Sequence, residues 1–579
     1  MFKASSHAWG IRAIVAIGLL SFGAAALADT PKQTLGDLVR AGKRESVLAA
    51  ITSPDVNVNE KAPDGSTALM WATFNADREL VGALLKAGAK ADVTSTYGAT
   101  ALSEAIKLDD IELVRRLLDA GANVNSPNLD NQTALMLAIS GGSLPIAKLL
   151  VERGADVNAV ETFRNQNALM WAAGTNQPDI VDLLLAHGAK NVDARAKFDD
   201  WPRQQTSEPR AQYQSRQTGG LTALLYATRS GCLRCAQALV KAGADVNKPN
   251  PDGITPLLNA LDNKHFDVAM FLLDKGANPN VWDMNGRTPV YMAIDMNSFR
   301  GGGGFGGRGG GGRNGFPAPE GEAENQSAAS KVTALDVARR LIDMGVDVNH
   351  QLTRKRPYGA GRGRFADYDM RGGAGPLFVA ALSNDQDAMA LLLAHGAEVD
   401  LNNVLQMTPL MIVAGMRGTG RAGGGGPGGG GPGGGDPQAR IIKGIDMLLD
   451  AGADINARVT DSRTHTAKIM AYVQGRDQEG RTALFAAAES GSDRVVKHLL
   501  ERGADPAIRD AAGKTALDAA KAPPAGGPGA GAAAGAAASE GAERAAAARK
   551  AARDATIAIL EAATPKSASA AAPPVAAAK

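Results

Sequence analysis

The sequence has few of the residues that build large cores or cross-linked small domains. Aromatic side chains make up only 4% of the 579 residues, glycine occurs 69 times, and the two cysteines are Cys232 and Cys235. Two cysteines are too few for disulfides to stabilise the whole fold, and so few aromatic side chains do not favour several large hydrophobic cores. A chain of this length must therefore gain stability in another way, by stacking many small units.

An excess of charge of one sign is also missing. The 62 basic and 60 acidic residues leave a net charge of +2. This balance gives no global field that would attract nucleic acid or an anionic membrane, so any polyanion binding would be local. The seven histidines show no zinc-ligand spacing. We expect no nucleic-acid partner, no metal, no cofactor and no catalytic residues.

The N-terminus has an apolar run that is too short for the ~20 residues of a membrane-spanning helix. Residues 1–28 combine Lys3 and Arg12 with the apolar run 14–20 and the small residues 26–28. This pattern is typical of a secretory signal peptide, and a retained membrane anchor is the weaker alternative. We expect cleavage after Ala28, no membrane span in the mature chain, and an exported protein that is periplasmic or secreted.

One unit of about 33 residues recurs along most of the chain. In residues 98–125, Thr100 can cap a first helix, and a second apolar helix ends at Gly121, a residue suited to a left-handed cap. The motif Thr-(Ala/Pro)-(Leu/Val) returns every 33 or 34 residues where nothing is inserted, and Leu-Leu-x-x-Gly-Ala interleaves with it. Each short helix pair exposes apolar residues on two sides, so it needs a copy of itself against each face.

These two motifs resemble the ankyrin repeat, in which Thr-Pro-Leu-His-x-Ala precedes a second helix and Gly-Ala-Asp-Val-Asn. The resemblance implies an all-α fold, an ankyrin-repeat solenoid of about twelve helix-turn-helix repeats with finger loops, interrupted by loop insertions. The family's histidine is mostly replaced by apolar residues, so we expect apolar packing in its place. We expect residues 29–63 to be an N-terminal capping repeat, residues 64–521 the solenoid, and residues 539–563 a C-terminal capping helix.

Insertions interrupt the repeats at two kinds of place. One set falls in the finger-loop slot before the next helix: 191–219, 350–372 and 457–478. The other set is rich in glycine, proline or alanine and falls between the two helices of one repeat: 297–331, 416–439 and the linker 522–538. We expect this low-complexity second set to be unpacked and residues 564–579 to form a disordered tail.

Cys232 and Cys235 stand at the start of a second helix. Three interpretations are open, namely a redox site, a local disulfide and two free thiols. Cys235 occupies a slot that is apolar in other repeats, so we favour the disulfide, formed in an oxidising compartment.

The resemblance implies a non-catalytic scaffold for protein–protein interaction, and we expect a monomer that binds a protein partner. The alternatives are a cell-wall or polyanion binder with local Arg/Lys/Tyr patches and an enzyme whose site is built from the insertions. The slot four residues after each repeat's threonine should face the concave surface, and it holds Trp71, Trp171, Tyr226 and Met292 among others. The finger-edge insertions concentrate arginine and aromatic residues, the types that dominate interfaces. The candidate partner-binding residues are Trp71, Trp171, Tyr226, Trp201, Tyr213, Arg354, Arg356, Tyr358, Phe365, Tyr368 and Tyr472.

Overall fold

The computed structural model describes residues 34–198, 219–283, 286–298, 332–353, 373–416, 436–460, 478–522 and 540–564. The chain divides into two compact units, Met1–Leu129 and Asp130–Lys579. The described part of the first unit forms six helices: α1 (Leu35–Arg40), α2 (Arg44–Ala50), α3 (Ala68–Phe74), α4 (Arg78–Lys86), α5 (Ala101–Lys107) and α6 (Ile111–Asp119).

The helices of the second unit are α7 (Ala134–Ser140), α8 (Leu144–Glu152), α9 (Ala168–Gly174), α10 (Pro178–Ala186), α11 (Ala223–Ser230), α12 (Leu233–Lys241), α13 (Pro256–Asp262), α14 (Phe266–Asp274), α15 (Pro289–Ser298), α17 (Ala334–Asp343), α18 (Pro376–Ser383), α19 (Gln386–Ala394), α20 (Pro409–Val413), α21 (Pro437–Asp450), α23 (Ala483–Ser490), α24 (Asp493–Glu501), α25 (Ala516–Lys521) and α26 (Glu540–Ala563). Over the described ranges of the whole chain, the only extended pairing consists of the isolated bridges Val160–Asn167 and Phe198–Gly219.

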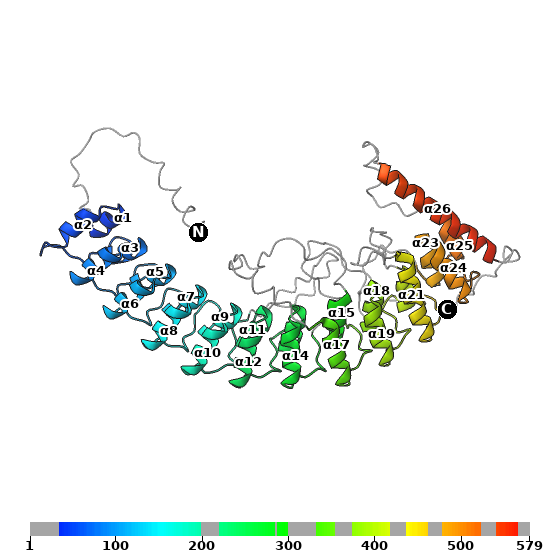
Figure 1. The fold of residues 1–579 in the computed structure, drawn as a ribbon, viewed down its shortest axis with the longest axis horizontal. Helices are drawn as coiled ribbons and strands as arrows, with labels where there is room; N and C mark the ends of the chain where they lie inside the picture. Colours follow the sequence, from blue (N-terminus) through cyan, green and yellow to red (C-terminus); the bar gives the residue numbers. More distant parts are fainter. Residues whose placement is uncertain are drawn as a thin grey trace, which may run out of the picture. The chain divides into compact units, whose positions relative to one another are not determined.

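Consecutive helices pair into twelve antiparallel units across the described residues. In the second unit, the first helices of the pairs lie side by side in one row and the second helices in another (Figure 1). For example, α9 packs on α11 and α10 packs on α12. The all-α repeat fold expected from the sequence is therefore confirmed.

Side-chain caps explain where the first helices begin. The hydroxyl of Thr67 accepts a hydrogen bond from the N–H of Met70 at 3.4 Å, and Thr255 caps α13 in the same way at 3.3 Å. Asn167 replaces the threonine at α9 and accepts from the Met170 N–H at 2.9 Å. Because each cap satisfies an N–H that the helix itself leaves free, the threonine motif fixes the register of each repeat.

In most repeats the slot of the family's histidine is filled by a buried apolar or aromatic side chain, although Ser103 and Asp518 are polar exceptions. Tyr291, Phe378 and Phe485 occupy it and are the three largest fully buried side chains among the described residues. Met136 takes the same slot in α7 and is 0% exposed. The expected apolar packing at this position is confirmed, and burial of such side chains stabilises each repeat by about 2 kcal/mol.

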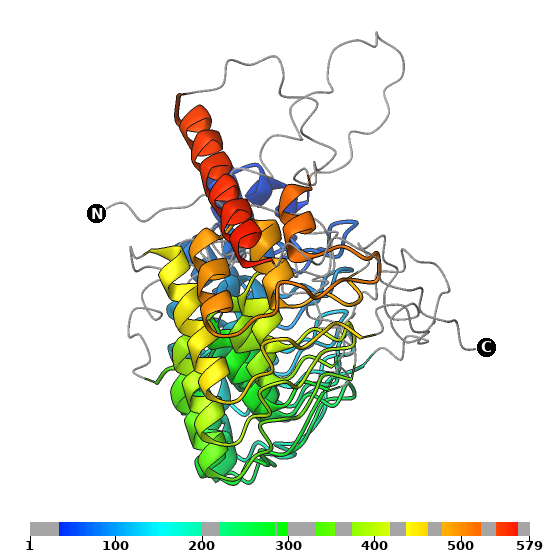
Figure 2. The same cartoon turned by 90° about the vertical axis from the view of Figure 1, so that its right-hand side faces the viewer.

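The fingers are tight hairpin turns between one repeat and the next. In an uninterrupted finger, the Asn250 N–H donates to the Ile254 carbonyl at 2.9 Å, and the Gly253 N–H donates back to Asn250 at 3.0 Å. Gly253 has a φ of 79°, a conformation that glycine adopts without strain. In the second unit the loops that carry these turns project to one side of the helix rows (Figure 2).

The same hairpin base closes beneath each finger-edge insertion. Leu352 donates to the Ala374 carbonyl at 3.1 Å and Val459 donates to Arg481 at 3.0 Å, where an uninterrupted finger has the bond from Asn250 to Ile254. The third insertion closes between Ala196 and Leu221 at 3.0 Å. The expected bounds of 191–219, 350–372 and 457–478 therefore start too early, because residues 191–198, 350–353 and 457–460 belong to the described backbone that leads into each insertion.

The two glycine-rich intervals between paired helices also have narrower bounds than expected. Helix α15 continues to Ser298, so the interval expected at 297–331 starts later. Helix α21 starts at Pro437 after the cap Asp436, whose side chain accepts from the Gln438 N–H at 3.0 Å, so the expected end at residue 439 was wrong. The cores of both intervals lie outside the described residues, as do the expected signal peptide, the linker core and the tail after Thr564.

An asparagine ladder ties successive fingers of the second unit together. Its members Asn158, Asn247, Asn349 and Asn456 each donate from the side-chain amide to a glycine carbonyl of the following repeat, at 3.1 to 3.3 Å. Each also accepts a hydrogen bond from a backbone N–H two residues beyond that glycine, at 2.7 to 2.9 Å. One short side chain thus satisfies two backbone groups that would otherwise lack partners.

Asp400 occupies a ladder position but lacks a donor. Its Oδ2 accepts from the Asp454 N–H at 2.9 Å, whereas its Oδ1 is buried and has no hydrogen-bond partner within the described chain. Burial raises the pKa of Asp400, and the nearby charge of Asp454 raises it further. Asp400 is therefore a weak point in the ladder.

The last repeat is closed by α26, which packs on α24 and α25 (Figure 1). Thr556 and Leu560 are fully buried, and Arg553 donates from Nε to the Ala520 carbonyl at 2.8 Å.

Among the described residues, no helix combines the length and the apolar character needed to cross a membrane.

Candidate functional site

Exposed aromatic side chains gather on two neighbouring fingers of the second unit. Phe163 is 67% exposed and Phe198 is 51% exposed. The fingers are fastened together, because the Lys197 N–H donates to the Arg164 carbonyl at 2.7 Å and Asn165 Nδ2 donates to the Arg195 carbonyl at 3.3 Å. We call Phe163, Arg164, Arg195, Lys197 and Phe198 the finger patch.

A buried carboxylate shapes the first of these fingers. Glu161 is 2% exposed and accepts hydrogen bonds from the N–H groups of Phe163, Arg164 and Gln166 at 2.6 to 3.0 Å. Asn165 completes the turn with a φ of 55°. The Glu161 carboxylate holds the backbone of the turn through these hydrogen bonds, and the side chains of Phe163 and Arg164 are exposed on the outside of the turn.

A shallow depression of about 410 Å³ lies between the two fingers. Its walls are formed by Thr162, Asn165, Arg195, Ala196, Lys197 and Phe198. The depression is open to solvent, combines apolar and cationic walls, and contains no acidic side chain among these residues. Such a surface suits a side chain or short segment of a macromolecule better than a small molecule, which needs an enclosed pocket.

The electrostatic environment of the finger patch is positive. The Arg164 guanidinium lies 5.7 Å from the centre of the Phe163 ring, and Arg195 Nη1 donates to the Gly220 carbonyl at 3.3 Å. Lys197 is exposed. None of the three cations forms an ion pair within the described part of the chain.

The adjoining first-helix face adds aromatic surface and a fourth cation. The Tyr226 hydroxyl accepts a hydrogen bond from Gln166, and the Arg229 guanidinium lies 4.8 Å from the centre of the Tyr226 ring. Burial lowers the pKa of Arg229, and the charge of Arg164 lowers it further. Trp171, on the neighbouring first helix, is half-buried, and its Nε1 has no hydrogen-bond partner among the described residues.

Two residues of the expected inner-face slot are buried. Tyr226 is 8% exposed and Met292 is 1% exposed, so the expectation that they face an open surface was wrong; both are packed against neighbouring helices instead. In the first unit, Trp71 is half-buried and donates from Nε1 to Ser66 Oγ at 3.0 Å. Its ring therefore serves the packing of its own repeat as well as the surface.

Comparison with known families agrees with the repeat geometry. A family model for ankyrin repeats in three copies matches residues 35–128, 109–196 and 224–300, and a model of the single ankyrin repeat matches residues 479–511. The chain is an ankyrin-repeat protein. No curated protein matches it. Ankyrin repeats generally mediate protein–protein interaction, and proteins built from them are typically non-catalytic scaffolds.

All eight candidate residues in the finger-edge insertions lie outside the described chain. These are Trp201, Tyr213, Arg354, Arg356, Tyr358, Phe365, Tyr368 and Tyr472. The structure describes the hairpin bases from which the insertions start, and Phe198 stands directly before the first of them. The finger patch of this ankyrin-repeat protein thus adjoins the interval 199–218.

Sequence reasoning missed Phe163 and Trp282. Trp282 is 59% exposed, and its ring stacks on His350 at 5.7 Å between ring centres. Both residues lie in finger loops, where the family's repeat has no core position to fill. An aromatic residue in such a slot is the signal that could have identified them, since no packing role explains it.

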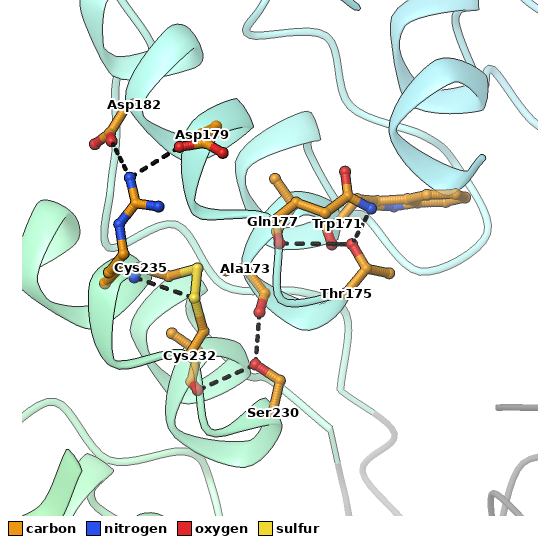
Figure 3. Close-up of a disulfide and its surroundings, with 12 residues drawn as sticks. Trp171, Ala173, Thr175, Gln177, Asp179, Asp182, Ser230, Cys232 and Cys235 are labelled. Atoms are coloured by element: carbon orange, nitrogen blue, oxygen red, sulfur yellow. Dashed lines mark hydrogen bonds and ion pairs between the residues drawn. A yellow bond between two sulfur atoms is a disulfide. The ribbon is translucent and has the colours of Figure 1, made fainter. Parts of the chain in front are cut away.

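The two cysteines of this ankyrin-repeat protein form a disulfide (Figure 3). Cys232 caps α12, and both cysteines are buried, with exposures of 2% and 0%. Arg234 in the same turn pairs with Asp179 at 2.8 Å and Asp182 at 3.6 Å on α10. The buried sulfurs are shielded from thiol reagents in the folded state.

No group of three or more metal-ligating side chains occurs within the described ranges.

Proposed function

We propose that this ankyrin-repeat protein is a non-catalytic scaffold whose protein partner binds to the finger patch and the adjoining face that carries Trp171 and Arg229. The observation that supports this proposal is the exposure of Phe163 and Phe198 on two fastened fingers, beside cations that form no ion pair with any described residue. Aromatic and arginine side chains supply most of the binding energy at protein interfaces. A rigid backbone beneath them reduces the entropy lost on binding.

Rigidity is the second support for this face. The finger of residues 161–166 is held by Glu161 from within, and by Lys197 and Arg195 from the next finger. Below it, Gln166 is bonded to Tyr226 on α11. Exposed aromatic residues on a preorganised surface of this kind are a feature of interaction sites rather than of inert loops.

Site-specific photocrosslinking in the producing cell tests the proposal. A benzoylphenylalanine residue replaces Phe163 in one variant and Lys148, an exposed residue on the second helix α8, in a control. We expect the Phe163 variant to form a discrete crosslink to one protein, identified by mass spectrometry, that the Lys148 variant lacks. Equal crosslinking from both positions, or none from Phe163 and from a third variant with the probe at Phe198, would overturn the proposed binding face.

We also propose that the protein is exported. Residues 1–28 have the pattern of a signal peptide, and the disulfide between Cys232 and Cys235 is a bond that persists in oxidising compartments. N-terminal sequencing of the mature protein should start at Asp29 in a periplasmic or secreted fraction. A chain that retains residues 1–28 in the cytosolic fraction would refute export.

A further inference from the structure

The finger patch combines three cations with two exposed aromatic rings. Arg164, Arg195 and Lys197 lie on two adjacent fingers, and no acidic side chain of the described chain forms an ion pair with them. Asp199 and Asp200 follow Phe198 in sequence and lie outside the described residues, whereas the nearby described acids Glu161 and Asp193 bind backbone N–H groups. Glu161 binds backbone N–H groups within its own turn, and Asp193 accepts from the Asp245 N–H at 3.2 Å.

The positive region is short. The loop before it contributes the exposed Asp130, whose carbonyl accepts the Thr162 N–H at 2.8 Å. The finger after it turns at Asp252, next to Pro251, which lies against Gly220. Acidic residues therefore bound the cationic surface on both sides, and a long polyanion would have to pass over them.

The cations are also of a kind that suits carboxylates. Two of the three are arginines, whose planar guanidinium groups bind carboxylates through paired hydrogen bonds. Half-buried Arg229, whose pKa the charge of Arg164 lowers, adds a guanidinium on which no described acid acts. Phe163 and Phe198 flank these groups with exposed rings, so an apolar side chain beside the carboxylates would gain by covering them.

From this charge and shape complementarity, we propose that the partner presents a short acidic segment with interspersed apolar side chains to the finger patch. Its carboxylates bind Arg164, Arg195 and Lys197, and an apolar side chain covers Phe163 or Phe198 beside the depression. This inference rests on the proposed function and names the chemistry of its partner. The interval 199–218 of the same chain and a polyanion are the competing occupants.

Peptide binding to the full chain tests the inference. The probe is a fluorescein-labelled peptide of about nine residues, Glu-Glu-Leu repeated, which spans about 30 Å when extended. Comparison peptides replace Glu by Lys or Leu by Ser, and heparin serves as the polyanion. Fluorescence anisotropy at about 50 and 200 mM NaCl gives the affinity of each probe and its salt dependence.

We expect the Glu-Glu-Leu peptide to bind at least about tenfold more tightly than either comparison peptide. The double variant Arg164→Glu, Lys197→Glu should weaken it by about tenfold or more, and Phe163→Ala with Phe198→Ala by about fivefold. The milder pair Arg164→Gln, Lys197→Gln should show a smaller loss in the same direction. The matched control Lys148→Glu on α8 should change nothing, and circular dichroism should show that all variants remain folded.

Four results would overturn the inference. The first is equal binding of the acidic and basic peptides, and the second is an equal loss from Lys148→Glu. The third is heparin binding that depends on Arg164 and Lys197 while the acidic peptide does not bind, which would assign the patch to a polyanion. If deleting 199–218 is required before the peptide binds, that interval is the occupant in the free protein and the inference also fails. A crosslink from Phe163 that survives the charge reversals would retain the proposed function and reject only the acidic partner.

Discussion

Replacing Asp400 by asparagine should stabilise the protein. The substitution is nearly isosteric and gives the ladder position the amide donor that Asn349 and Asn456 use. By the register of the repeats, the new amide faces the Gly452 carbonyl, just as Asn349 faces that of Gly396. The accepting contact with the Asp454 N–H is kept through the amide oxygen.

The gain can be worked out from the contacts. One added amide-to-carbonyl hydrogen bond contributes about 1 kcal/mol, and removing an unpaired buried carboxylate oxygen adds about as much where solvent is excluded. Asp400 is only half-buried, so we expect a total of about 1 to 1.5 kcal/mol at neutral pH. The like-charge repulsion from Asp454 is relieved by the same change.

The sign of the pH dependence follows from the raised pKa. A carboxyl group whose pKa is higher in the folded state destabilises the fold when it is ionised, and this penalty disappears below the unfolded value of 3.8. The gain from Asp400→Asn should therefore be largest near pH 7 and shrink as the pH falls towards 3.8, because the protonated acid of the wild type is itself a donor.

Urea denaturation followed by circular dichroism at about pH 7 and pH 4 measures both quantities. Since a repeat array need not unfold in one step, hydrogen exchange at the Asp454 amide reports the local effect. The matched control is Asn349→Asp, which should lose stability at neutral pH and recover part of it in acid. An unchanged urea midpoint for Asp400→Asn, or the same gain at both pH values, would refute this account of the ladder.

Two further predictions concern glycine strain and acid stability. Gly231→Ala should lower the free energy of unfolding by about 3 kcal/mol, because a Cβ there would lie 2.5 Å from the His265 ring at a φ of 73°. Gly243→Ala, at a φ of 95°, meets no atom within 4 Å and should lower it by about 1 kcal/mol. Thermal melting of both variants measures the two losses, and equal losses would contradict this prediction. Hydrogen bonds from Thr515 lower the pKa of Asp518, so its contribution is present above pH 3.8 and lost as the pH falls through the lower folded value. Asp518→Asn should thus weaken the last repeat at pH 7 but have little effect at strongly acid pH, as hydrogen exchange in α25 can show; a loss that does not depend on pH would contradict this.

The repeat framework could be predicted because its signals are local. Thr255 caps a helix three residues away, and Gly253 permits the turn just before it, so the motif spacing alone places both. Apolar residues in the histidine slot, such as Phe378, predict their own burial. These interactions involve neighbours in sequence or the copy in the next repeat, and a period of 33 or 34 residues identifies both.

The candidate surface was harder to predict, because it depends on which loop residues the stack leaves uncovered. Phe163 and Phe198 come together because one finger is bonded to the next, through the Lys197 N–H and the Arg164 carbonyl, just before an insertion starts. The slot that was expected to be open buries Tyr226, whose hydroxyl is held by a finger residue. The spacing of the threonine motif gives the number of residues between two repeats, but it does not show at which residues the hairpin base beneath an insertion closes.

The closed hairpin bases have a consequence for loop-closure entropy and for how such a chain can vary. Leu352 pairs with Ala374 and Val459 with Arg481, both 22 positions apart, where an uninterrupted finger pairs Asn250 with Ile254. Lengthening a loop in this proportion costs only about 1.5 kcal/mol, since the closure penalty grows with the logarithm of length. The two insertions are thus loops of equal length that start from equivalent hairpin bases. Exchanging them, or grafting one onto the finger at Asn250, would change what the edge displays without moving a helix.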